Sequence, residues 1–330
     1  MIYLARYREN LYMNFGEVFM ERSLHQFLAV AETGSISAAS KLLNVTQPTI
    51  TVNIKNLEDK HQVELFERSS RGMRLTSFGS ILYEKTRVMA RLETQASQEI
   101  ANLRTGEREI IGVGCGHAWW DLFVYDSIEM LKSDLPNASI YVENGSNLNC
   151  MWKLLAGEII VSVGHHIRNL VPGISAEFIP LFKAKDAYYV SSDNPILSKE
   201  CSKEDLLNLR WISSAPKDRR YSEILLDTDS ENYEKIFNPS GSPSYSSNSI
   251  LTCADMVKRS GGYTVYPIDM RNSFAELGLT PLSVNSPIDS QQVGIYYLSE
   301  RRNEPALQKL LNSITICAER YASDNTDRNR

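Results

Sequence analysis

Apolar residues recur at helical spacing in three short segments between residues 24 and 57, and no other feature constrains the fold as strongly. Gly34 and Asn44 separate the segments, and both residue types suit the left-handed turn that ends a helix. Ser35 and Thr46 precede the second and third segments, where a hydroxyl can cap a helix. This order predicts two short helices joined by a tight turn and then a third, which is a helix-turn-helix.

The third helix is expected to bury Ile50, Ile54 and Leu57 on one face and to turn polar side chains outward. Amides can pair with adenine edges, hydroxyls and Lys with phosphates, and methyl groups with thymine, so this face suits the major groove of DNA. The outward side chains are Gln47, Thr49, Thr51, Asn53 and Lys55. Such a face can also be merely solvated, so the helix alone does not predict DNA binding and the segment after it must be considered.

Residues 65–76 read as two short strands around an Arg71-Gly72 turn. Arg68, Arg71 and Arg74 would then lie at the rim of a hairpin, where they could contact phosphates or the minor groove. A helix-turn-helix followed by an arginine-rich hairpin is more specific than either feature alone, and together they predict DNA binding.

Residues 20–80 resemble the winged helix-turn-helix of LysR-type transcriptional regulators, through the segments FLAVAETGSISAASKLLNVTQPTIT (27–51), LEDK (57–60), LFER (65–68) and RLTSFG (74–79). The resemblance implies DNA contacts from Gln47, Pro48, Thr51, Lys55 and the wing. The predicted DNA-contact set is Ser37, Gln47, Pro48, Thr49, Thr51, Asn53, Lys55, Arg68, Arg71 and Arg74. The family usually has Arg at the position of Val52 and Gln at that of Asn53, which implies an unusual operator preference.

A single long helix is expected from about Ser77 to Arg104, with Thr76 as its cap. Its apolar residues form a narrow stripe with steps of three, four and seven: Phe78, Leu82, Met89, Leu92, Ala96, Ile100 and Leu103. The stripe can pack along the rest of the chain or against a second copy. The resemblance favours dimerisation, and a two-fold DNA site requires paired heads.

From residue 109 onward, strand-like and helix-like segments alternate, which predicts a parallel α/β sheet. Gly114 and Gly116 do not complete a dinucleotide-binding fingerprint. The layout, with LAGE (155–158) and GGYTVYP (261–267), resembles the effector-binding domain of the same regulators, which is similar to a periplasmic binding protein with two lobes. The fold class expected is therefore α/β: a winged helix-turn-helix head rich in α-helix, a long linker helix and a two-lobe α/β body.

The expected boundaries follow these patterns: N-terminal extension 1–19, DNA-binding head 20–78 with its helix-turn-helix at about 36–55, linker helix 79–106, lobe I 107–182 and 267–320, lobe II 183–266, and tail 321–330. Met20 is an alternative start to Met1.

Ligands of two-lobe α/β folds bind in the crevice at the carboxyl ends of strands. The candidate effector contacts at these positions are Gly116, His117, Gly145, Ser146, Asn147, His165, Ser213, Ser214, Ala215, Tyr263 and Thr264. Ser146 opens a helix beside free N–H groups and would suit an anionic ligand, although a helix cap is the ordinary role of such a residue.

Other chemistry-bearing residues have plainer interpretations. Trp119 and Trp120 can stack on a ligand or lie in the core. The His165-His166 pair has no Cys or carboxylate at ligand spacing, so neither a metal nor another cofactor is expected. Cys201 and Cys253 could form a peroxide switch, but scattered cysteines without a C-x-x-C pair usually indicate reduced thiols.

The net charge of −5 divides unevenly along the chain. Residues 1–106 carry 13 Lys and Arg against 11 Asp and Glu, which gives +2, whereas the remaining 22 and 29 give −7. A slightly basic head on an acidic body permits DNA binding. No apolar run approaches the length of a membrane-spanning helix and no secretory signal is evident, so the expected location is the cytoplasm, at the nucleoid, with no membrane partner.

These patterns predict a regulator that binds a double-stranded DNA operator as a homodimer or homotetramer. The resemblance implies a small-molecule effector and leaves RNA polymerase as a further partner. An α/β enzyme or solute-binding protein is the competing class, but its usual nucleophile, phosphate-loop and metalloprotease motifs are missing. A head fused to a body that only oligomerises is the third alternative.

Overall fold

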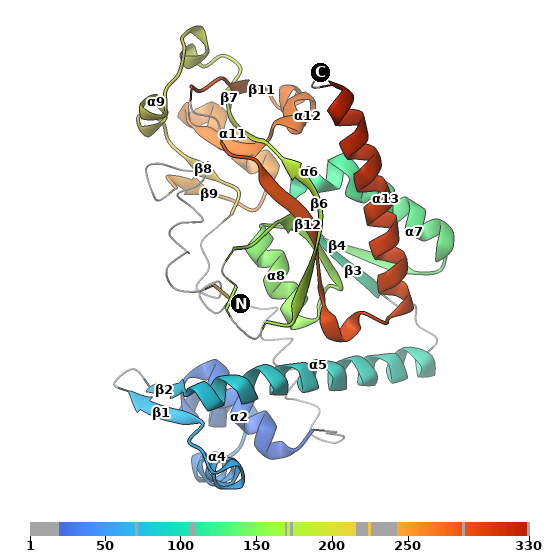
Figure 1. The fold of residues 1–330 in the computed structure, drawn as a ribbon. Coiled ribbons are helices and arrows are strands. Elements are labelled where there is room, and N and C mark those ends of the chain that lie inside the picture. The colour runs from blue at the N-terminus through green and yellow to red at the C-terminus, as the bar shows by residue number, and fades with distance from the viewer. Residues whose placement is uncertain are drawn as a thin grey trace. The chain divides into compact units, whose positions relative to one another are not determined.

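The computed structural model describes residues 20–69, 72–105, 110–168, 170–171, 174–215, 224–225, 243–285 and 288–328. The chain divides into two compact units, residues 1–107 and 108–330, whose elements are labelled in Figure 1. The expected N-terminal extension 1–19 lies outside the described residues.

The first unit contains the predicted helix-turn-helix, hairpin and long helix. Its elements are α2 (Arg22–Thr33), α3 (Ile36–Leu43), α4 (Gln47–His61), β1 (Phe66–Ser69), β2 (Gly72–Leu75) and α5 (Ser77–Thr105). Gly34 ends α2 and Asn44 ends α3 in the left-handed conformation. Ser35 and Thr46 accept hydrogen bonds from the Ala38 and Thr49 amides, which confirms both predicted caps.

The core of this unit forms where α4 meets α2 and α3. Ile50, Ile54 and Leu57 of α4 are buried together with Phe27 of α2, whose ring lies 5.2 Å from that of Phe66 at the start of the hairpin. The hairpin is antiparallel, with Ser69 opposite Gly72. The predicted wing is therefore tied to the helices through an apolar core.

The second unit contains a five-stranded sheet and a three-stranded sheet, each of which organises one lobe. Lobe I has β3 (Ile110–Cys115), β4 (Ser139–Asn144), β5 (Val161–His165), β6 (Ala176–Ala184) and β12 (Gln291–Leu298), in the order β4-β3-β5-β12-β6. β3, β4 and β5 are parallel, but β12 runs antiparallel to both β5 and β6. The sheet is therefore mixed, where the alternating pattern predicted a parallel one.

Helices cover both faces of the lobe I sheet. α6 (His117–Trp119), a π-helical turn (Trp120–Val124), α7 (Tyr125–Asp134) and α13 (Pro305–Arg328) pack on one face, and α8 (Asn147–Ala156) packs on the other. Successive side chains of β12 point to opposite faces of this sheet. Val293 and Ile295 pack in the core that contains α7 and α13, and Tyr296 packs in the core that contains α8.

Lobe II is built on the sheet β10-β7-β11. Its elements are β7 (Asp186–Ser191), 3₁₀ turn η2 (Pro195–Ser198), α9 (Lys203–Leu207), β8 (Ile212–Ser213), β9 (Tyr245–Ser246), α11 (Ile250–Ser260), β10 (Tyr263–Pro267), 3₁₀ turn η4 (Ile268–Met270), α12 (Arg271–Glu276) and β11 (Leu279–Leu282). β8 and β9 form a separate parallel pair.

Two predicted boundaries require correction. The sequence assigned residues from 267 onward to lobe I, but β11 pairs with β7, so the chain remains in lobe II until it approaches β12. The expected tail 321–330 is also wrong in part, because α13 continues to Arg328. A short 3₁₀ turn, η5 (Ser299–Arg301), lies between β12 and α13. No helix in the described ranges is long and apolar enough to cross a membrane.

The first turn of α5 leaves no room for a side chain at Gly79. A Cβ there would overlap the Leu65 carbonyl oxygen. We therefore expect Gly79→Ala to lower the free energy of unfolding by about 1–3 kcal/mol, because overpacking outweighs the better helix propensity of Ala. Urea denaturation followed by far-UV circular dichroism measures this, with the exposed Ser77→Ala as control. A Gly79→Ala variant as stable as the control would contradict this packing.

Candidate nucleic-acid interface and ligand cleft

The buried ridge of α4 determines which of its side chains face outward. Ile50, Ile54 and Leu57 are buried, so the opposite face of the helix is exposed. The exposed members of the predicted DNA-contact set near this face are Ser37, Gln47, Pro48, Thr49, Thr51 and Lys55. These residues form one surface at the starts of α3 and α4, which we call the α4 face.

Hydrogen bonds connect the two helix starts that form the α4 face. The Gln47 Nε2 donates to the Ser37 Oγ at 3.5 Å, and the Thr51 hydroxyl donates to the Gln47 carbonyl at 3.0 Å. The hydroxyls of Thr46 and Thr49 lie 2.8 Å apart. The face therefore presents amide and hydroxyl groups in defined positions, as base or phosphate recognition requires.

Asn53 and Val52 depart from the expected arrangement. Asn53 is half-buried, and its Nδ2 donates to the Gln26 Oε1 at 2.9 Å, which ties α4 to α2. Val52 is 56% exposed and lies on the side of α4 opposite the buried ridge. An apolar side chain thus occupies the position where the resemblance implies an Arg.

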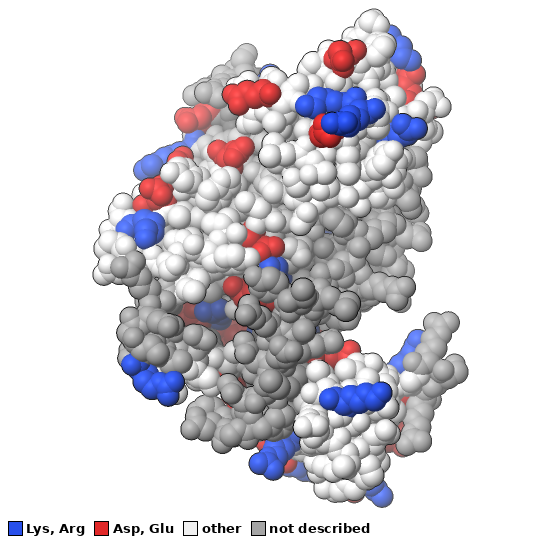
Figure 2. Space-filling model, turned by 180° about the vertical axis from the view of Figure 1, so that it is seen from behind, with Lys and Arg blue, Asp and Glu red and all other residues white. Residues whose placement is uncertain are grey.

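The basic residues of the hairpin are only partly described. Arg74 is exposed on β2, Arg68 belongs to β1 opposite Met73, and Arg71 lies outside the described residues. On the face of the molecule seen in Figure 2, acidic and basic side chains of the described residues are interspersed without one broad basic patch.

The predicted ligand contacts of lobe I meet at one edge of its sheet. β4, β3 and β5 are parallel neighbours, and their carboxyl ends lead to Gly145, Gly116 and the last residue of β5, His165. Backbone bonds hold these ends in register, since the Gly145 amide donates to the Cys115 carbonyl at 3.1 Å. The structure therefore brings together Gly116, His117, Gly145, Ser146, Asn147 and His165.

Contacts at this edge fix several of the side chains. The Ser146 hydroxyl accepts from the Asn149 amide at 3.2 Å and caps α8. The Asn147 Nδ2 donates to the His165 carbonyl oxygen. The buried Trp119 lies edge-on to the His165 ring at 5.3 Å, whereas Trp120 is half-buried and packs on Tyr125.

A hydrogen bond of His117 spans the two lobes. The His117 Nε2 lies 2.8 Å from the Asn248 carbonyl oxygen, so this nitrogen carries the proton. Asn248 lies between β9 and α11 of lobe II. Ser213, Ser214 and Ala215 end β8 and continue from it, and the Ser213 hydroxyl bonds to the backbone of Ala215.

Tyr263 and Thr264 are placed within lobe II rather than at an open surface. Tyr263 is fully buried in a cluster with Tyr188, whose ring lies 5.6 Å away, and burial raises its pKa. Thr264 is also buried, and its hydroxyl has no hydrogen-bond partner among the described residues.

Asp186 is a polar residue of this region that the sequence analysis missed. It follows Lys185 at the crossing from β6 to β7, and its Oδ1 lies 4.0 Å from the His165 Nε2. Burial raises the pKa of Asp186 to about 7 and lowers the pKa of His165 to about 4. The only sequence signal is an acid at the start of an apolar strand, which does not by itself predict burial.

The cysteines and histidines do not form a redox or metal centre in the described residues. All five cysteines are buried and free. Burial raises the pKa of Cys115 to about 12 and that of Cys253 to about 11, and Cys201 is in a different core cluster from Cys253. No described group of three or more His, Cys, Asp or Glu could hold a metal ion.

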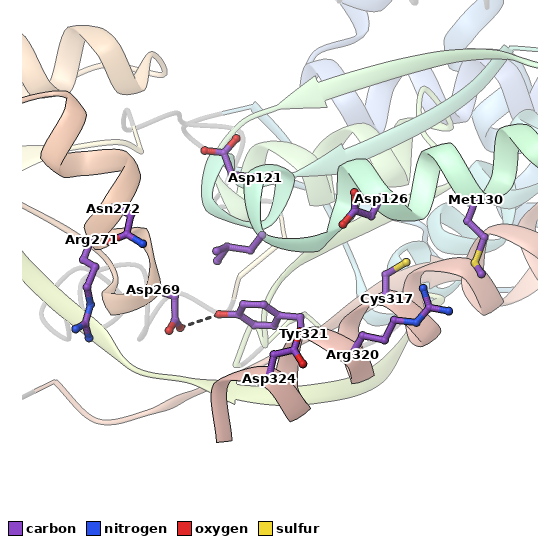
Figure 3. Close-up of a pocket in the computed structure, with 11 residues that line it drawn as sticks. Asp121, Asp126, Met130, Asp269, Arg271, Asn272, Cys317, Arg320, Tyr321 and Asp324 are labelled. Atoms are coloured by element: carbon purple, nitrogen blue, oxygen red, sulfur yellow. Dashed lines mark hydrogen bonds between the residues drawn. The ribbon is translucent and has the colours of Figure 1, made fainter. Parts of the chain in front are cut away.

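A polar cavity of about 660 Å³ is lined by residues of the π-helical turn, α7, α12 and α13. Figure 3 shows Asp121 and Asp126 on one side and Asp269 on another, with the Tyr321 hydroxyl donating to the Asp269 Oδ2 at 2.7 Å. Arg271 and Arg320 also line it. None of the predicted effector contacts is among its lining residues.

Comparisons with known families match both units. The family model described as "Bacterial regulatory helix-turn-helix protein, lysR family" matches residues 22–80. The family model described as "LysR substrate binding domain" matches residues 104–315.

Individual relatives are distant. The HTH-type transcriptional regulator TdcA of Escherichia coli is 24% identical over 92% of this chain and 94% of its own length. The uncharacterized HTH-type transcriptional regulator YbhD of Escherichia coli is 29% identical over 54% of this chain and 55% of its own length. Among solved structures, full-length CbnR complexed with its target DNA is 18% identical, covers 90% of this chain and all of its own, and has a TM-score of 0.48.

The buried Asp186 and His165 should affect stability with opposite dependence on pH. Between about pH 4 and 7 the folded chain keeps the Asp186 proton that the unfolded chain loses, so this carboxyl lowers the free energy of unfolding as pH rises. Between about pH 4 and 6.5 the unfolded chain gains a His165 proton that the folded chain excludes, so this imidazole raises the free energy of unfolding as pH rises.

Accordingly, the free energy of unfolding of Asp186→Asn, relative to that of the unmodified protein, should increase by about 1–3 kcal/mol as pH rises toward 7. For His165→Gln the same difference should increase by about 1–3 kcal/mol as pH falls toward 4. Urea denaturation at several pH values measures both, with the exposed Asp255→Asn as control. Parallel profiles for the two variants would contradict the burial of the pair.

Proposed function

Because this chain belongs to the LysR family of bacterial regulatory helix-turn-helix proteins, we propose that it binds a two-fold-symmetric DNA operator through the α4 face. In this proposal a small-molecule effector in the cleft between the lobes switches the bound regulator. The chain is a DNA-binding transcriptional regulator with an effector-binding domain, and the family and its relatives are regulators rather than enzymes.

The exposed α4 face carries the proposed DNA contact. The ridge of Ile50, Ile54 and Leu57 is sequestered in the core, which leaves Gln47 and Lys55 free to reach the major groove. The α2–α3 pair supports this helix, and Arg74 on the adjacent hairpin suits a phosphate contact.

The long helix α5 supports a dimer. The middle of α5 packs on the start of the first unit, where Ala90 joins a cluster with Met20 and Leu28, and Glu93 accepts from the Met20 amide. A second set of apolar side chains lies along one side of the helix and remains exposed: Phe78, Ile81, Met89, Leu92, Ala96 and Ile100. A second copy of α5 would bury this stripe, and pairing would present two heads to a two-fold operator. A tetramer is the alternative assembly.

The contact between the lobes supports the proposed switch. The sheet edge of lobe I faces lobe II through the contact of His117 with Asn248, so a ligand there would contact both lobes. An anionic group could bind at the start of α8, beside Ser146. Ligand binding would then favour one lobe arrangement, alter the spacing of the paired heads, and change DNA bending or contact with RNA polymerase.

The proposed DNA contact predicts a specific loss for variants of the α4 face. Fluorescence anisotropy with the DNA upstream of the protein's own coding region should show binding about 10³-fold or more tighter than to scrambled DNA. Gln47→Ala should cost about 1–3 kcal/mol of this binding, because it removes a base contact. Lys55→Ala should weaken binding to both DNAs and reduce the salt slope by about 1.

Lys60→Ala is the matched control, because Lys60 is an exposed cation at the other end of α4 and lies 3.6 Å from Glu21. Binding that remains unchanged in Gln47→Ala and Lys55→Ala would refute the assignment of the α4 face.

The proposed dimer predicts that a charge on the exposed stripe dissociates the protein. Leu92→Lys should shift the molecular mass measured by light scattering toward the monomer, because a buried unpaired charge opposes association. Thr94→Lys places the same charge on an exposed part of the other side of α5 and should leave the mass unchanged. Equal masses for the two variants would argue against this interface.

A further inference from the structure

A buried acid and a buried imidazole meet at the crossing between the lobes. Asp186 opens β7 directly after the chain leaves β6, and its side chain is 2% exposed. His165 ends β5 at the ligand edge of lobe I, and its side chain is 17% exposed. The Asp186 Oδ1 and the His165 Nε2 lie 4.0 Å apart, which is too far for a direct hydrogen bond.

Both side chains also have buried polar atoms without partners. Asp186 Oδ2 and His165 Nδ1 form no hydrogen bond in the described structure. The described ion pairs give Asp186 no Lys or Arg partner, and His165 is its one ion-pair neighbour there. The Asn147 Nδ2 uses the His165 backbone carbonyl, so it does not satisfy the ring.

Burying these polar atoms lowers the stability of the fold unless a further group forms hydrogen bonds with them. A buried carboxylate without a hydrogen-bonded partner is expensive, and native proteins rarely keep such groups without a reason. Burial accordingly raises the pKa of Asp186 to about 7 and lowers that of His165 to about 4, so neither group is charged readily by itself. His165 lies at the sheet edge that the predicted effector contacts of lobe I share.

The hydrogen-bonding capacity of the two groups indicates which chemical group would bind between them. An ionised carboxylate is an acceptor only, and a neutral imidazole offers one further acceptor nitrogen. An ammonium group has three donors and a positive charge, and it can bridge acceptors that are 4.0 Å apart. The ring of Trp119 lies beside that of His165, with ring centroids 5.3 Å apart, so an aromatic side chain borders the two groups.

We propose that Asp186 and His165 form a subsite for a primary ammonium group of the effector. This inference rests on the proposed function, because it names the chemistry that the cleft recognises. It is independent of the anionic group proposed at the start of α8, and an effector with both groups would be a zwitterion.

Thermal denaturation of the full chain with three probes that share one carbon skeleton tests this subsite. The probes are n-propylammonium chloride, 1-propanol and sodium propionate, compared at pH 8 and constant ionic strength. We expect the ammonium probe alone to raise Tm, because it binds the folded state only. Asp186→Asn should weaken the apparent affinity for this probe by about tenfold or more, because it removes the counter-charge.

Asp255→Asn is the matched control, since it removes an exposed carboxylate of lobe II and should leave the response unchanged. If Asp186→Asn does not fold, His165→Leu replaces it and should also weaken the response, because the second acceptor is lost. The proposal is overturned if no probe raises Tm, if propanol or propionate acts equally, or if the Asp186→Asn response equals that of the unmodified protein.

DNA anisotropy on the same preparations separates the two proposals. Specific DNA binding without an ammonium response would refute the subsite alone. An ammonium response that depends on Asp186, without specific DNA binding, would refute the proposed regulation while the subsite stands.

Discussion

The antiparallel insertion of β12 between β5 and β6 is the constraint on which the second unit depends. β12 is the last strand among the described residues, yet it pairs along its whole length with β6 and with most of β5. Gly294 permits this, because a Cβ there would overlap the backbone of Ile179. Since β5 ends at His165 and β6 leads to Asp186, this pairing also determines the position of the buried acid and imidazole.

The head illustrates what local sequence can predict. Its helix ends depend on residues within a few positions, such as Gly34, Asn44 and the caps Ser35 and Thr46, and each acts as the pattern indicates. The outward face of α4 was likewise predictable from its buried ridge. Asn53 was not, because its partner Gln26 is 27 residues away on another helix.

In the second unit, several features depend on contacts between distant segments and could not be predicted from local sequence. The boundary at 267 failed because nothing near Pro267 reveals that β11 will pair with β7 rather than with the lobe I sheet. The strand ends that meet at the edge of the lobe I sheet were predictable from the alternation of strands and helices. Asp186 was not, since its burial arises from the crossing between lobes, and hydropathy assigns a carboxylate to the surface.

The two lobes are joined by more than the chain itself. His117 bonds to the Asn248 carbonyl, and Tyr321 on α13 bonds to Asp269 of lobe II while its ring packs on Phe182, 5.0 Å away. A ligand can shift an equilibrium between two arrangements of the lobes only by the difference in its affinity for the two arrangements. A ligand that supplies a counter-charge to Asp186 would have a large difference in affinity, because the Asp186 Oδ2 is otherwise buried without a hydrogen-bond partner. This gain exists only in the arrangement in which the lobes enclose the ligand. The same unsatisfied group that weakens the empty protein can therefore provide the free energy for the switch.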